Sequence, residues 1–490
     1  ETGKSVVMKG LFNILAAAGL LLWCAPVRAQ ALPSFADLVE KLQPSVVNIS
    51  TTHKPQEDSS NEEMLGIEST NPRIKDYFNP QNPQQLSLGS GFIIDGDGYI
   101  ITNNHVIDQA EEITVTLADN RQLTARLVGR DGKTDIALIK VEASEKLPAV
   151  KLGDSDKIRV GDWVLAIGNP FGLGGSVTAG IVSAKSRDIE AGPYDNFIQT
   201  DASINQGSSG GPMFNLDGEV IGINTAIFST NGGSMGIGFA VPVNLTHFVI
   251  EQLKSKGKVE RGWIGIKIQP NSGDIAHSLS QQAQRGVIVS SVSEGSSAKA
   301  AGIEAGDIIL SFDGQPIDDT KNFSRMVAET EVGKTINLEI WRDKQIRKIS
   351  LPVMLMPEEP SLYKEAKEEN RDTAPLVEAV PERQNAPDGL IDALEISVAD
   401  LTPEILNKYS LSNDARGVVV TGVVPGSDAE LKGLSVGRLI TQIDKKAIFD
   451  INDVKTYVND AKIENNRPVL LLVNDNNVPH YVAVKLKSNE

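Results

Sequence analysis

The sequence predicts a mainly β chain that is divided into several domains, and three observations carry this prediction. At 490 residues the chain is too long for one hydrophobic core, so about two to four domains are expected. From about Ser45 to Val243, short runs of β-branched and apolar residues alternate with Gly, Asp and Asn, which favours an all-β barrel or sandwich. Towards the C-terminus one residue pattern occurs twice, which indicates two copies of a smaller domain.

The N-terminal segment is typical of a secretory signal. Two lysines precede the apolar run 11–27, and small residues follow at Ala29 and Ala31. This is the order of charged region, apolar region and cleavage site found in exported proteins. The alternative is an uncleaved anchor helix, but the apolar run is short for a membrane span. We therefore assign residues 1–31 to a signal peptide with an N-terminal extension, and we expect cleavage after Ala29 or Ala31.

The composition argues against several kinds of site. The formal net charge of −17 disfavours nucleic acid as the main partner, because there is no excess of basic residues to neutralise phosphates. The one cysteine, Cys24, lies within the signal segment. The exported chain would then have no disulfide, no zinc–thiolate site and no cysteine nucleophile.

The first folded domain is expected over residues 32–256 and consists of many short strands. A DGDG turn joins two of them and predicts a hairpin. The expected strands are SVVNIST, GFII, YIIT, EITVTL, DIALIKV, WVLAIG, EVIGINTAI and GIGFAV. A polar insertion interrupts the series at about residues 53–87, and a loop of this length is usually functional or disordered. A helix is expected to close the domain, with an apolar face made of Leu245, Phe248, Val249 and Leu253.

The repeated pattern begins at Gly286 and again at Gly417. Three glycines of the first copy align without a gap with three of the second, namely Gly295, Gly302 and Gly306 with Gly426, Gly433 and Gly437. Such a repeat predicts two copies of one small domain, over residues 258–355 and 388–490. The segment between them, residues 356–387, is charged and punctuated by Pro, as expected of a solvated linker.

The segment SINQGSSGGPMF contains a Gly-rich turn with two adjacent serines, Ser208 and Ser209. Runs of Gly and Ser are usually plain loops. Here strand-like sequence flanks the run on both sides, which favours a turn held on a β scaffold, where glycines let backbone N–H groups converge on a developing oxyanion. A serine hydroxyl is a weak nucleophile without a base, so a histidine is required. The residues of the turn alone do not show which serine would react.

His105 is the best candidate among the five histidines for this base. It follows a strand-like run inside the β domain, whereas the others lie in the polar insertion, the closing helix or the repeated domains. Asp135 is the best candidate for the carboxylate that orients the imidazole, because it precedes a wholly apolar strand and should be partly buried. Asp131, in a DG turn, is interpreted as an ordinary turn residue. The chain order His, Asp, Ser is that of the chymotrypsin arrangement.

Six motifs follow one another along the chain: TNNHV, TDIALIK, IGNPFGL, TAGIVSAKSR, NFIQTDASINQGSSGGPMFN and GINTAI. Together they closely resemble the HtrA/Deg family of exported serine endoproteases. The resemblance covers nearly the whole chain after the signal segment. It implies a chymotrypsin-like double β-barrel protease domain followed by two α+β PDZ domains, as in DegP/DegQ-like members, with the polar insertion as a regulatory loop.

The resemblance also implies roles for individual residues. The catalytic triad would be His105, Asp135 and Ser209. The oxyanion donors would be Gly207, Ser208 and Ser209. At position 208 the family usually has Asn. The primary specificity pocket would include Ile204, Ile223, Thr225 and Ala226. Arg187 matches an arginine that, in the family, helps relay the state of the PDZ domain to the active-site loops.

The first repeated domain contains RGWIGIKI, which matches the family loop that binds a peptide carboxylate through backbone amides. This match implies a site at Trp263, Ile264, Gly265 and Ile266. The alternative is an ordinary first strand of a small β domain. The second repeated domain is less typical, since Arg438 stands in the place of Asp307. In the family, second PDZ domains often serve assembly rather than ligand capture.

The activity implied by the resemblance is that of an ATP-independent periplasmic endopeptidase that degrades unfolded proteins and also acts as a chaperone, with no metal or cofactor. Its partners would be unfolded polypeptides and C-terminal peptides. It would form a homotrimer and higher multiples, and peripheral membrane association is a further option. The rival, from a different class, is a PDZ-based chaperone or scaffold with an inactive or resting protease domain. The presence of all three triad residues weighs against this rival.

Overall fold

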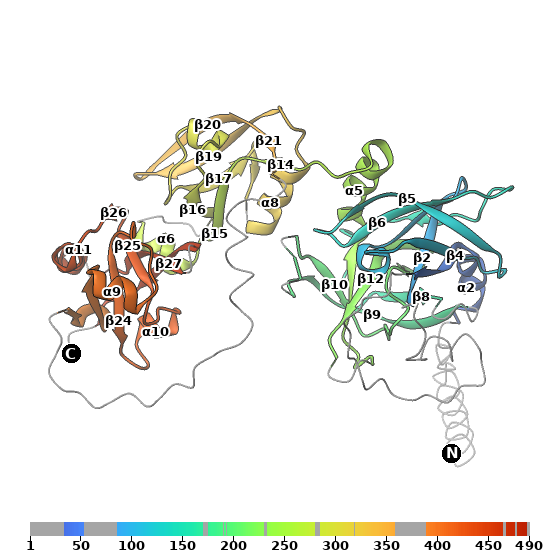
Figure 1. Cartoon of the computed structure of the whole chain (residues 1–490), viewed down its shortest axis with the longest axis horizontal. Coiled ribbons are helices and arrows are strands. Elements are labelled where there is room, and N and C mark those ends of the chain that lie inside the picture. The colour runs from blue at the N-terminus through green and yellow to red at the C-terminus, as the bar shows by residue number, and fades with distance from the viewer. Residues whose placement is uncertain are drawn as a thin grey trace, which may run out of the picture.

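A computed structural model describes residues 34–52, 86–169, 175–189, 191–192, 194–229, 233–279, 285–317, 319–357, 389–463, 467–475 and 478–487. The predicted signal peptide, most of the polar insertion and nearly all of the linker lie outside the described residues. The described part of the chain forms two β-barrels and two smaller domains of strands and helices (Figure 1). No helix within it has the length and apolar character needed to cross a membrane.

The first barrel is closed and has six strands. These are β1 (Val46–Thr52), β2 (Leu86–Asp95), β3 (Tyr99–Asn103), β4 (Glu112–Thr116), β5 (Gln122–Asp131) and β6 (Ile136–Val141). The order around the barrel is β1-β2-β3-β6-β5-β4, and β4 pairs with β1, for example at Val115 and Ile49. Three short helical turns accompany these strands, namely α2 (Ala36–Leu42), η1 (Gln43–Ser45) and α4 (Asn104–Ile107).

The second barrel follows directly. Its strands are β7 (Lys151–Leu152), β8 (Trp163–Gly168), β9 (Ser176–Arg187), β10 (Phe197–Thr200), β11 (Pro212–Phe214), β12 (Glu219–Ile227) and β13 (Gly238–Pro242). The order is β11-β8-β9-β10-β13-β12, and the additional pairing of β11 with β12 closes a ring, with β7 as a parallel strand beside β12. The predicted double β-barrel is thus confirmed.

All eight expected strands are present, but two long strands, β5 and β9, are absent from the list that the sequence predicts. In β5 the buried positions hold only Ala125, Gly129 and Asp131. In β9 they hold only Gly180 and Val182. Because neither strand buries a run of large apolar side chains, neither shows the alternating pattern from which strands are predicted.

The helix α5 (Val243–Lys256) closes the double barrel as predicted and packs across β5 and β6 (Figure 1). Its apolar face is rotated from the predicted one, since Leu245 and Phe248 are only half-buried. The buried residues are Val243, Thr246, Val249, Ile250 and Leu253. Thr246 can lie in the core because its hydroxyl donates to the carbonyl oxygen of Val243 (2.6 Å). Gly257 ends the helix in the left-handed conformation (φ 73°).

The two predicted PDZ domains, PDZ1 and PDZ2, share one architecture. The elements of PDZ1 are β14 (Gly262–Trp263), β15 (Ile266–Pro270), α6 (Gly273–Ser278), β16 (Val287–Val292), α7 (Ser297–Ala300), β17 (Ile308–Phe312), β18 (Gln315–Pro316), α8 (Thr320–Glu329), β19 (Thr335–Arg342), β20 (Gln345–Pro352) and β21 (Met354–Leu355). Those of PDZ2 are β22 (Leu390–Ile391), η3 (Asp392–Leu394), β23 (Ile396–Asp400), α9 (Pro403–Lys408), β24 (Val418–Val423), α10 (Asp428–Leu431), β25 (Leu439–Ile443), β26 (Lys446–Ala447), α11 (Ile451–Ile463), β27 (Val469–Asp475) and β28 (Val478–Val484).

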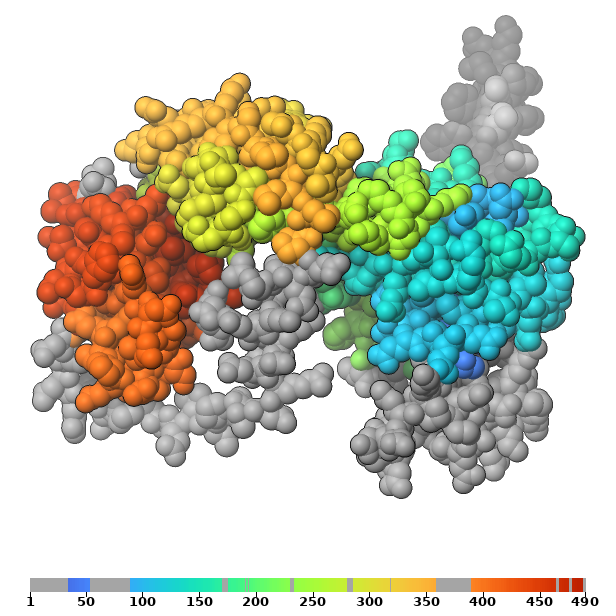
Figure 2. All heavy atoms as spheres, turned by 45° about the horizontal axis from the view of Figure 1, so that its top comes forward, coloured from blue at the N-terminus to red at the C-terminus, as the bar shows by residue number. Residues whose placement is uncertain are grey.

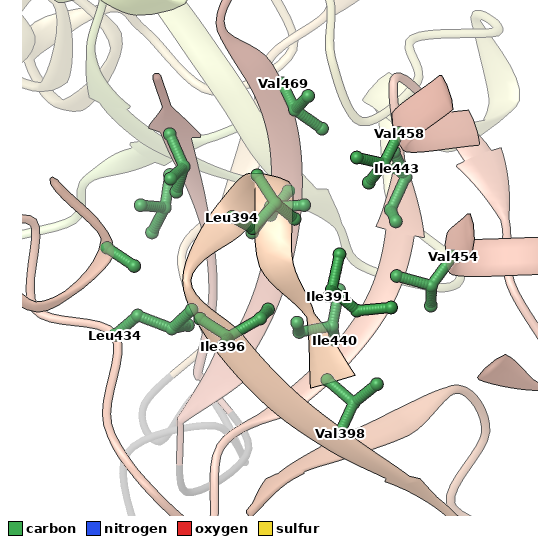
Figure 3. Close-up of a cluster of buried hydrophobic side chains, with 14 of the residues drawn as sticks. Ile391, Leu394, Ile396, Val398, Leu434, Ile440, Ile443, Val454, Val458 and Val469 are labelled. Carbon is green, nitrogen blue, oxygen red and sulfur yellow. The ribbon is translucent and has the colours of Figure 1, made fainter. Parts of the chain in front are cut away.

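Each PDZ domain buries its own core between its sheet and its longest helix. In PDZ1, α8 contributes Phe323 and Val327. In PDZ2, α11 contributes Val454 and Val458, which pack with strand residues such as Ile440 (Figure 3). The strand order is the same in both sheets except at the first strand. In PDZ1, β14 pairs with β21, whereas in PDZ2, β22 pairs with β23.

PDZ1 lies between the double barrel and PDZ2 (Figure 2). The two PDZ domains meet at a separate apolar cluster made of Ile275, Ile288, Ile308, Leu470, Leu472, Tyr481 and Ala483. Polar bonds flank this cluster: the Gln269 side chain bonds both the N–H (2.7 Å) and the carbonyl (2.9 Å) of Tyr481, and Lys432 pairs with Asp274. Because the cluster is apolar and buried, it holds the two domains against each other.

Candidate active site

His105 and Asp135 are brought together at one end of the first barrel. His105 lies in α4, directly after β3, and Asp135 lies in the turn between β5 and β6. The two carboxylate oxygens of Asp135 have different partners: Oδ2 is 2.6 Å from His105 Nδ1, and Oδ1 accepts the backbone N–H of His105 (2.9 Å). The carboxylate therefore fixes both the ring and the backbone of the histidine, and it leaves Nε2 as the ring's proton acceptor.

The backbone of Asp135 is in the left-handed conformation (φ 57°), which is rare for a residue other than glycine. Its carbonyl oxygen accepts hydrogen bonds from the Asn103 side chain (2.9 Å) and from the Asn104 backbone (3.0 Å). These bonds hold the strained turn against the end of β3. The Asp135 side chain is 27% exposed, so the expectation of partial burial is confirmed.

Ser209 enters the site from the second barrel, on the turn that precedes β11. Its hydroxyl donates to the carbonyl oxygen of Thr225 (3.4 Å), and among the described residues no hydrogen bond joins it to His105. Thr225 is also tied to the first barrel, because its Oγ1 accepts from the Asn103 side chain (3.1 Å). In the described part of the chain, the Ser209 hydroxyl is thus connected to the His105–Asp135 pair only indirectly, through Thr225 and Asn103.

Ser90 holds the Gly-Ser turn, and sequence reasoning missed it. This fully buried residue of β2 donates its hydroxyl to the carbonyl oxygen of Gly207 (2.5 Å) and its N–H to that of Ser209 (2.8 Å). The hydroxyl also accepts the N–H of Asn169 (2.8 Å). The first barrel thus positions a turn that belongs to the second. The available signal was a small polar residue between two glycines in GSGFII, at the start of an expected strand.

The backbone amides of the turn have different partners. The N–H of Ser208 donates to the carbonyl oxygen of Asn205 (2.9 Å). Among the described residues, the amides of Gly207 and Ser209 have no hydrogen-bond partner. Gly207 is in the left-handed region (φ 86°), which glycine adopts without strain. Of the three predicted oxyanion donors, Gly207 and Ser209 are therefore the two whose N–H groups are free to receive an oxyanion.

The residues predicted for the specificity pocket lie in two environments. Ile204 and Ile223 are buried within the second barrel, at 1% and 0% exposure. Thr225 and Ala226 line a cavity of about 270 Å³ together with His105, Asp135 and Tyr194. Among the described residues there is no group of three or more His, Cys, Asp or Glu side chains that could hold a metal ion.

The interpretation of Asp131 as an ordinary turn residue is wrong. Its side chain is 7% exposed and makes two hydrogen bonds, of 2.8 and 2.6 Å, with the equally buried guanidinium of Arg261, which lies just before β14. Burial alone would raise the pKa of Asp131, but the hydrogen bonds and the charge of Arg261 outweigh it, so the pKa lies below its ordinary value. The pair joins the strand that leads to Asp135 with the first residues of PDZ1.

Arg187, at the end of β9, donates to the Gln199 side chain on β10 (2.9 Å). The next residue, Asp188, pairs with Lys321 on α8 of PDZ1 (3.0 Å). The structure therefore places Arg187 beside a contact between the second barrel and PDZ1, while its own bond stays within the barrel.

The predicted carboxylate-binding loop of PDZ1 has a shape that suits an anion. The carbonyl oxygens of Ile264 and Gly265 accept bonds from Ala298 (3.0 Å) and Ser293 (2.8 Å) within the domain. Since a trans peptide directs its N–H opposite to its carbonyl, the amides that follow these carbonyls point outwards. Gly265 is required here, because a Cβ would lie 2.1 Å from the Cβ of Ser296.

Comparisons with known proteins agree with this architecture. Residues 89–223 match the trypsin-like peptidase domain family, and residues 262–353 match the PDZ domain family. Over 455 residues the chain is 42% identical to a protein of Rickettsia conorii described as a "Probable periplasmic serine endoprotease DegP-like", covering 90% of this chain and 87% of that protein. A Pseudomonas fulva protein of the same description is 42% identical over 472 residues, covering 93% and 94%.

Solved structures give the same result. One described as "HtrA-type protease AlgW with tripeptide" is 39% identical, covers 67% of this chain and 99% of its own, and superposes with a TM-score of 0.58. One described as the same protease "with decapeptide" covers 66% and 99%, with a TM-score of 0.55. The fold and these matches define a trypsin-like serine endoprotease that carries PDZ domains. Within that class, the chain belongs to the HtrA/Deg family.

Proposed function

We propose that His105, Asp135 and Ser209 are the catalytic triad of this endoprotease. The observation that carries the proposal is the pair of bonds from the Asp135 carboxylate to the ring and backbone of His105. This geometry directs Nδ1 towards the carboxylate, so Nε2 is the ring nitrogen that would take the proton of the nucleophile. The Ser209 hydroxyl, which bonds to the carbonyl oxygen of Thr225, must turn towards His105 when substrate binds.

The proposed reaction has two halves. Ser209 Oγ forms a bond to the scissile carbonyl carbon as its proton passes to His105 Nε2, and the carbonyl π electrons move to oxygen. The amides of Gly207 and Ser209 stabilise this oxyanion, and each donor contributes on the order of 10²–10³ in rate. The C–N bond then breaks as His105 returns the proton to the leaving amine. Water repeats the sequence on the acyl-enzyme and releases Ser209.

The substrate that we propose is unfolded polypeptide, and Thr225 and Ala226 beside the cavity would contact its side chains. PDZ1 would take C-terminal peptides at Trp263, Ile264, Gly265 and Ile266, which is supported by the outward amides of that loop and by the peptides in the related structures' descriptions. Arg187 would help relay the state of PDZ1, which is supported by the neighbouring Asp188–Lys321 pair.

We further propose that the protein works in the periplasm, as the descriptions of its relatives state for them. Residues 1–31 would be its signal peptide, residues 32–256 the protease domain, and residues 258–355 and 388–490 the PDZ domains. Chaperone activity and assembly as a homotrimer or higher multiple are parts of the same proposal that rest on the family alone.

The test is cleavage of an unfolded substrate such as reduced casein by matched variants of the two adjacent serines. Ser209→Ala is expected to abolish cleavage, because it removes the nucleophile. Ser208→Ala is expected to retain most of it, because position 208 contributes mainly its backbone. The reverse result would assign the nucleophile to Ser208.

Covalent labelling distinguishes an active protease from the alternative, a PDZ-based scaffold with an inactive protease domain. A serine-directed fluorophosphonate should label the unmodified chain at Ser209 and leave Ser209→Ala unlabelled. The reaction should be run with and without a C-terminal peptide, since a resting enzyme reacts only after activation. No labelling under either condition, with an active relative as positive control, would assign this chain to the scaffold class.

A further inference from the structure

The first strand of PDZ2 lies where a PDZ domain receives its ligand. PDZ domains bind a peptide by adding it as an antiparallel strand to a free sheet edge, beside a helix, with the peptide's C-terminus at the carboxylate-binding loop. In PDZ1 that edge belongs to β15, which has a strand neighbour on one side only, β16, among the described residues. In PDZ2 the equivalent edge belongs to β23, and β22 pairs with it antiparallel, through Ile391 with Ile396 and Leu390 with Ser397.

The direction and contacts of β22 are those of a bound peptide. The strand runs so that its C-terminal end meets the start of β23, where the domain's own loop, η3, begins. The pairing extends one residue further, since the N–H of Val398 donates to the carbonyl oxygen of Gly389 (3.0 Å). A Cβ built on Gly389 would lie 1.8 Å from the carbonyl oxygen of Val398 and 3.5 Å from Cδ1 of Ile451 in α11, so only glycine can lie this close to β23.

Ile391 anchors β22 in the core of PDZ2. It is 3% exposed and belongs to the PDZ2 core together with Val454 of α11 (Figure 3). The effect on the groove is visible when the two domains are compared. Ile266 and Ile268 of β15 are half-buried, whereas the equivalent Ile396 and Val398 of β23 are 0% and 3% exposed.

We propose that residues 389–391 occupy the peptide groove of PDZ2 in cis, so that each subunit captures C-terminal peptides at PDZ1 only. This inference rests on the proposed peptide binding by PDZ1. A segment tethered next to its site acts at an effective concentration of about millimolar or above, so a free peptide of micromolar affinity does not displace it at ordinary concentrations. The start of PDZ2 is thereby fixed to the edge of its own sheet.

The first experiment measures amide exchange in the full-length chain carrying Ser209→Ala, which prevents cleavage of the probe. The probe is a ten-residue peptide with an aliphatic C-terminal residue and a free carboxylate, and its C-terminally amidated form is the control. Without peptide, the Val398 amide should exchange slowly and the Ile268 amide fast. With peptide, exchange should slow at Ile268 and stay unchanged at Val398.

Binding stoichiometry gives the second measurement on the same protein, and one peptide per chain is expected. Two peptides per chain, or new protection in β23 when peptide is added, would overturn the inference while leaving PDZ1 binding intact. If no peptide binds anywhere, the proposed function of PDZ1 fails. The comparison of Val398 with Ile268 in the free chain still decides whether the PDZ2 edge is occupied, and equal fast exchange at both would overturn the inference.

A matched pair of variants tests whether β22 provides the protection. Ile391→Ser should raise the exchange rate at Val398 by about tenfold or more, the effect of losing most of one buried aliphatic side chain. Leu390→Ser should leave that rate unchanged, because Leu390 is 39% exposed. Protection at Leu471 in β27 serves as the control for folding of PDZ2. Loss of protection at Val398 in both variants, or in neither, would contradict the assignment of Ile391 as the anchor.

Discussion

Ser90 links the two barrels at the level of single atoms. Its hydroxyl donates to the carbonyl oxygen of Gly207 and its N–H to that of Ser209, so both bonds reach the Gly-Ser turn. The carbonyl oxygen of Ser90 in turn accepts the hydroxyl of Thr102 (2.8 Å). This fully buried residue thus fixes the carbonyl groups of Gly207 and Ser209. Orientation of such amides is what makes an oxyanion site effective, because no reorganisation is then needed during the reaction.

Ser90→Ala should lower kcat by about five- to tenfold, which corresponds to about 1 kcal/mol for the lost bond to the Gly207 carbonyl. The substitution also removes the bond from the N–H of Asn169, which lies outside the turn. KM should change little, because the lost bond holds the Gly-Ser turn and does not itself contact the substrate. The measurement is steady-state cleavage of a chromogenic peptide. Ser311→Ala is the control, since it removes another buried hydroxyl far from the site, in β17 of PDZ1. An equal loss of activity in both variants would show a general effect on folding.

The residues that chemistry requires were predictable, while those that support them were not. His105 and Asp135 could be selected because a serine nucleophile needs a base and a carboxylate in its own domain, whereas the choice of Ser209 over Ser208 came from the family resemblance. Arg438 could be seen only as a departure from Asp307. The structure explains it: Asp307 pairs with Arg342 on β19, and Arg438 pairs with Asp475 at the equivalent place on β27, so the two charges are exchanged. Such compensation is visible only once the strands are paired.

Among the secondary-structure elements, α5 shows how close packing constrains the sequence. Gly129 lies at a bulge in β5, beside the end of α5. A Cβ at this position would lie 2.3 Å from the carbonyl oxygen of Gly257 and 2.9 Å from Leu253 Cδ2. The helix end can therefore approach the strand only because the strand has no side chain there.

Gly129→Ala should destabilise the protease domain by about 1–3 kcal/mol, since the clash is with backbone that cannot move independently. Gly132→Ala is the matched control, because its Cβ would have only the Asn104 side chain within 4 Å, at 3.9 Å. The control should change stability by less than about 0.5 kcal/mol. Thermal unfolding of both variants in the Ser209→Ala background checks this. Equal melting temperatures would contradict the packing argument.

Whether a strand could be predicted from the sequence depended on how many of its side chains are buried. Strands such as β6 and β8 are buried almost throughout, so each can be recognised in the sequence as a continuous apolar run. The strands β5 and β9 take part in closed barrels through backbone pairing, while most of their side chains face solvent or other elements. Backbone hydrogen bonds leave no trace in the residue pattern, so these two strands could be located only by the structure.

For the whole molecule, the Asp131–Arg261 pair is a buried charge contact between the first barrel and the start of PDZ1. Both side chains are 7% exposed, and the Arg261 guanidinium also lies 4.9 Å from the centre of the Tyr194 ring. Removing one member of a buried pair leaves the other charge without compensation. Asp131→Asn should therefore destabilise the chain by about 3–5 kcal/mol. The measurement is chemical unfolding followed by a probe in each domain.

Asp108→Asn is the control for this prediction, because it breaks an exposed pair with Arg130 whose side chains are 47% and 44% accessible. Its effect should stay below about 1 kcal/mol. If the two variants lost the same stability, the junction would not depend on the buried pair.

The same pair predicts a dependence of stability on pH. The pKa of Asp131 is lowered in the folded chain, so its contribution is complete above the pKa of the unfolded state, about 4. It is lost as the pH falls through the folded-state pKa. The difference in unfolding free energy between the wild type and Asp131→Asn should thus be constant at neutral pH and should shrink below about pH 4. A difference that grew on acidification would contradict the assignment.

The strand β22 has a consequence for how such chains evolve. After a module is duplicated, its second copy need not lose its fold, its glycines or its core to acquire a new use. Here the second copy keeps the contact between its loop and its C-terminal segment, since the N–H of Lys487 donates to the carbonyl oxygen of Ala393 (2.9 Å), and it adds two residues upstream of that loop that pair with β23. Adding so short a strand is a small mutational step. It would convert a receptor for foreign chain ends into a module closed by its own chain, while the other copy keeps its ligand.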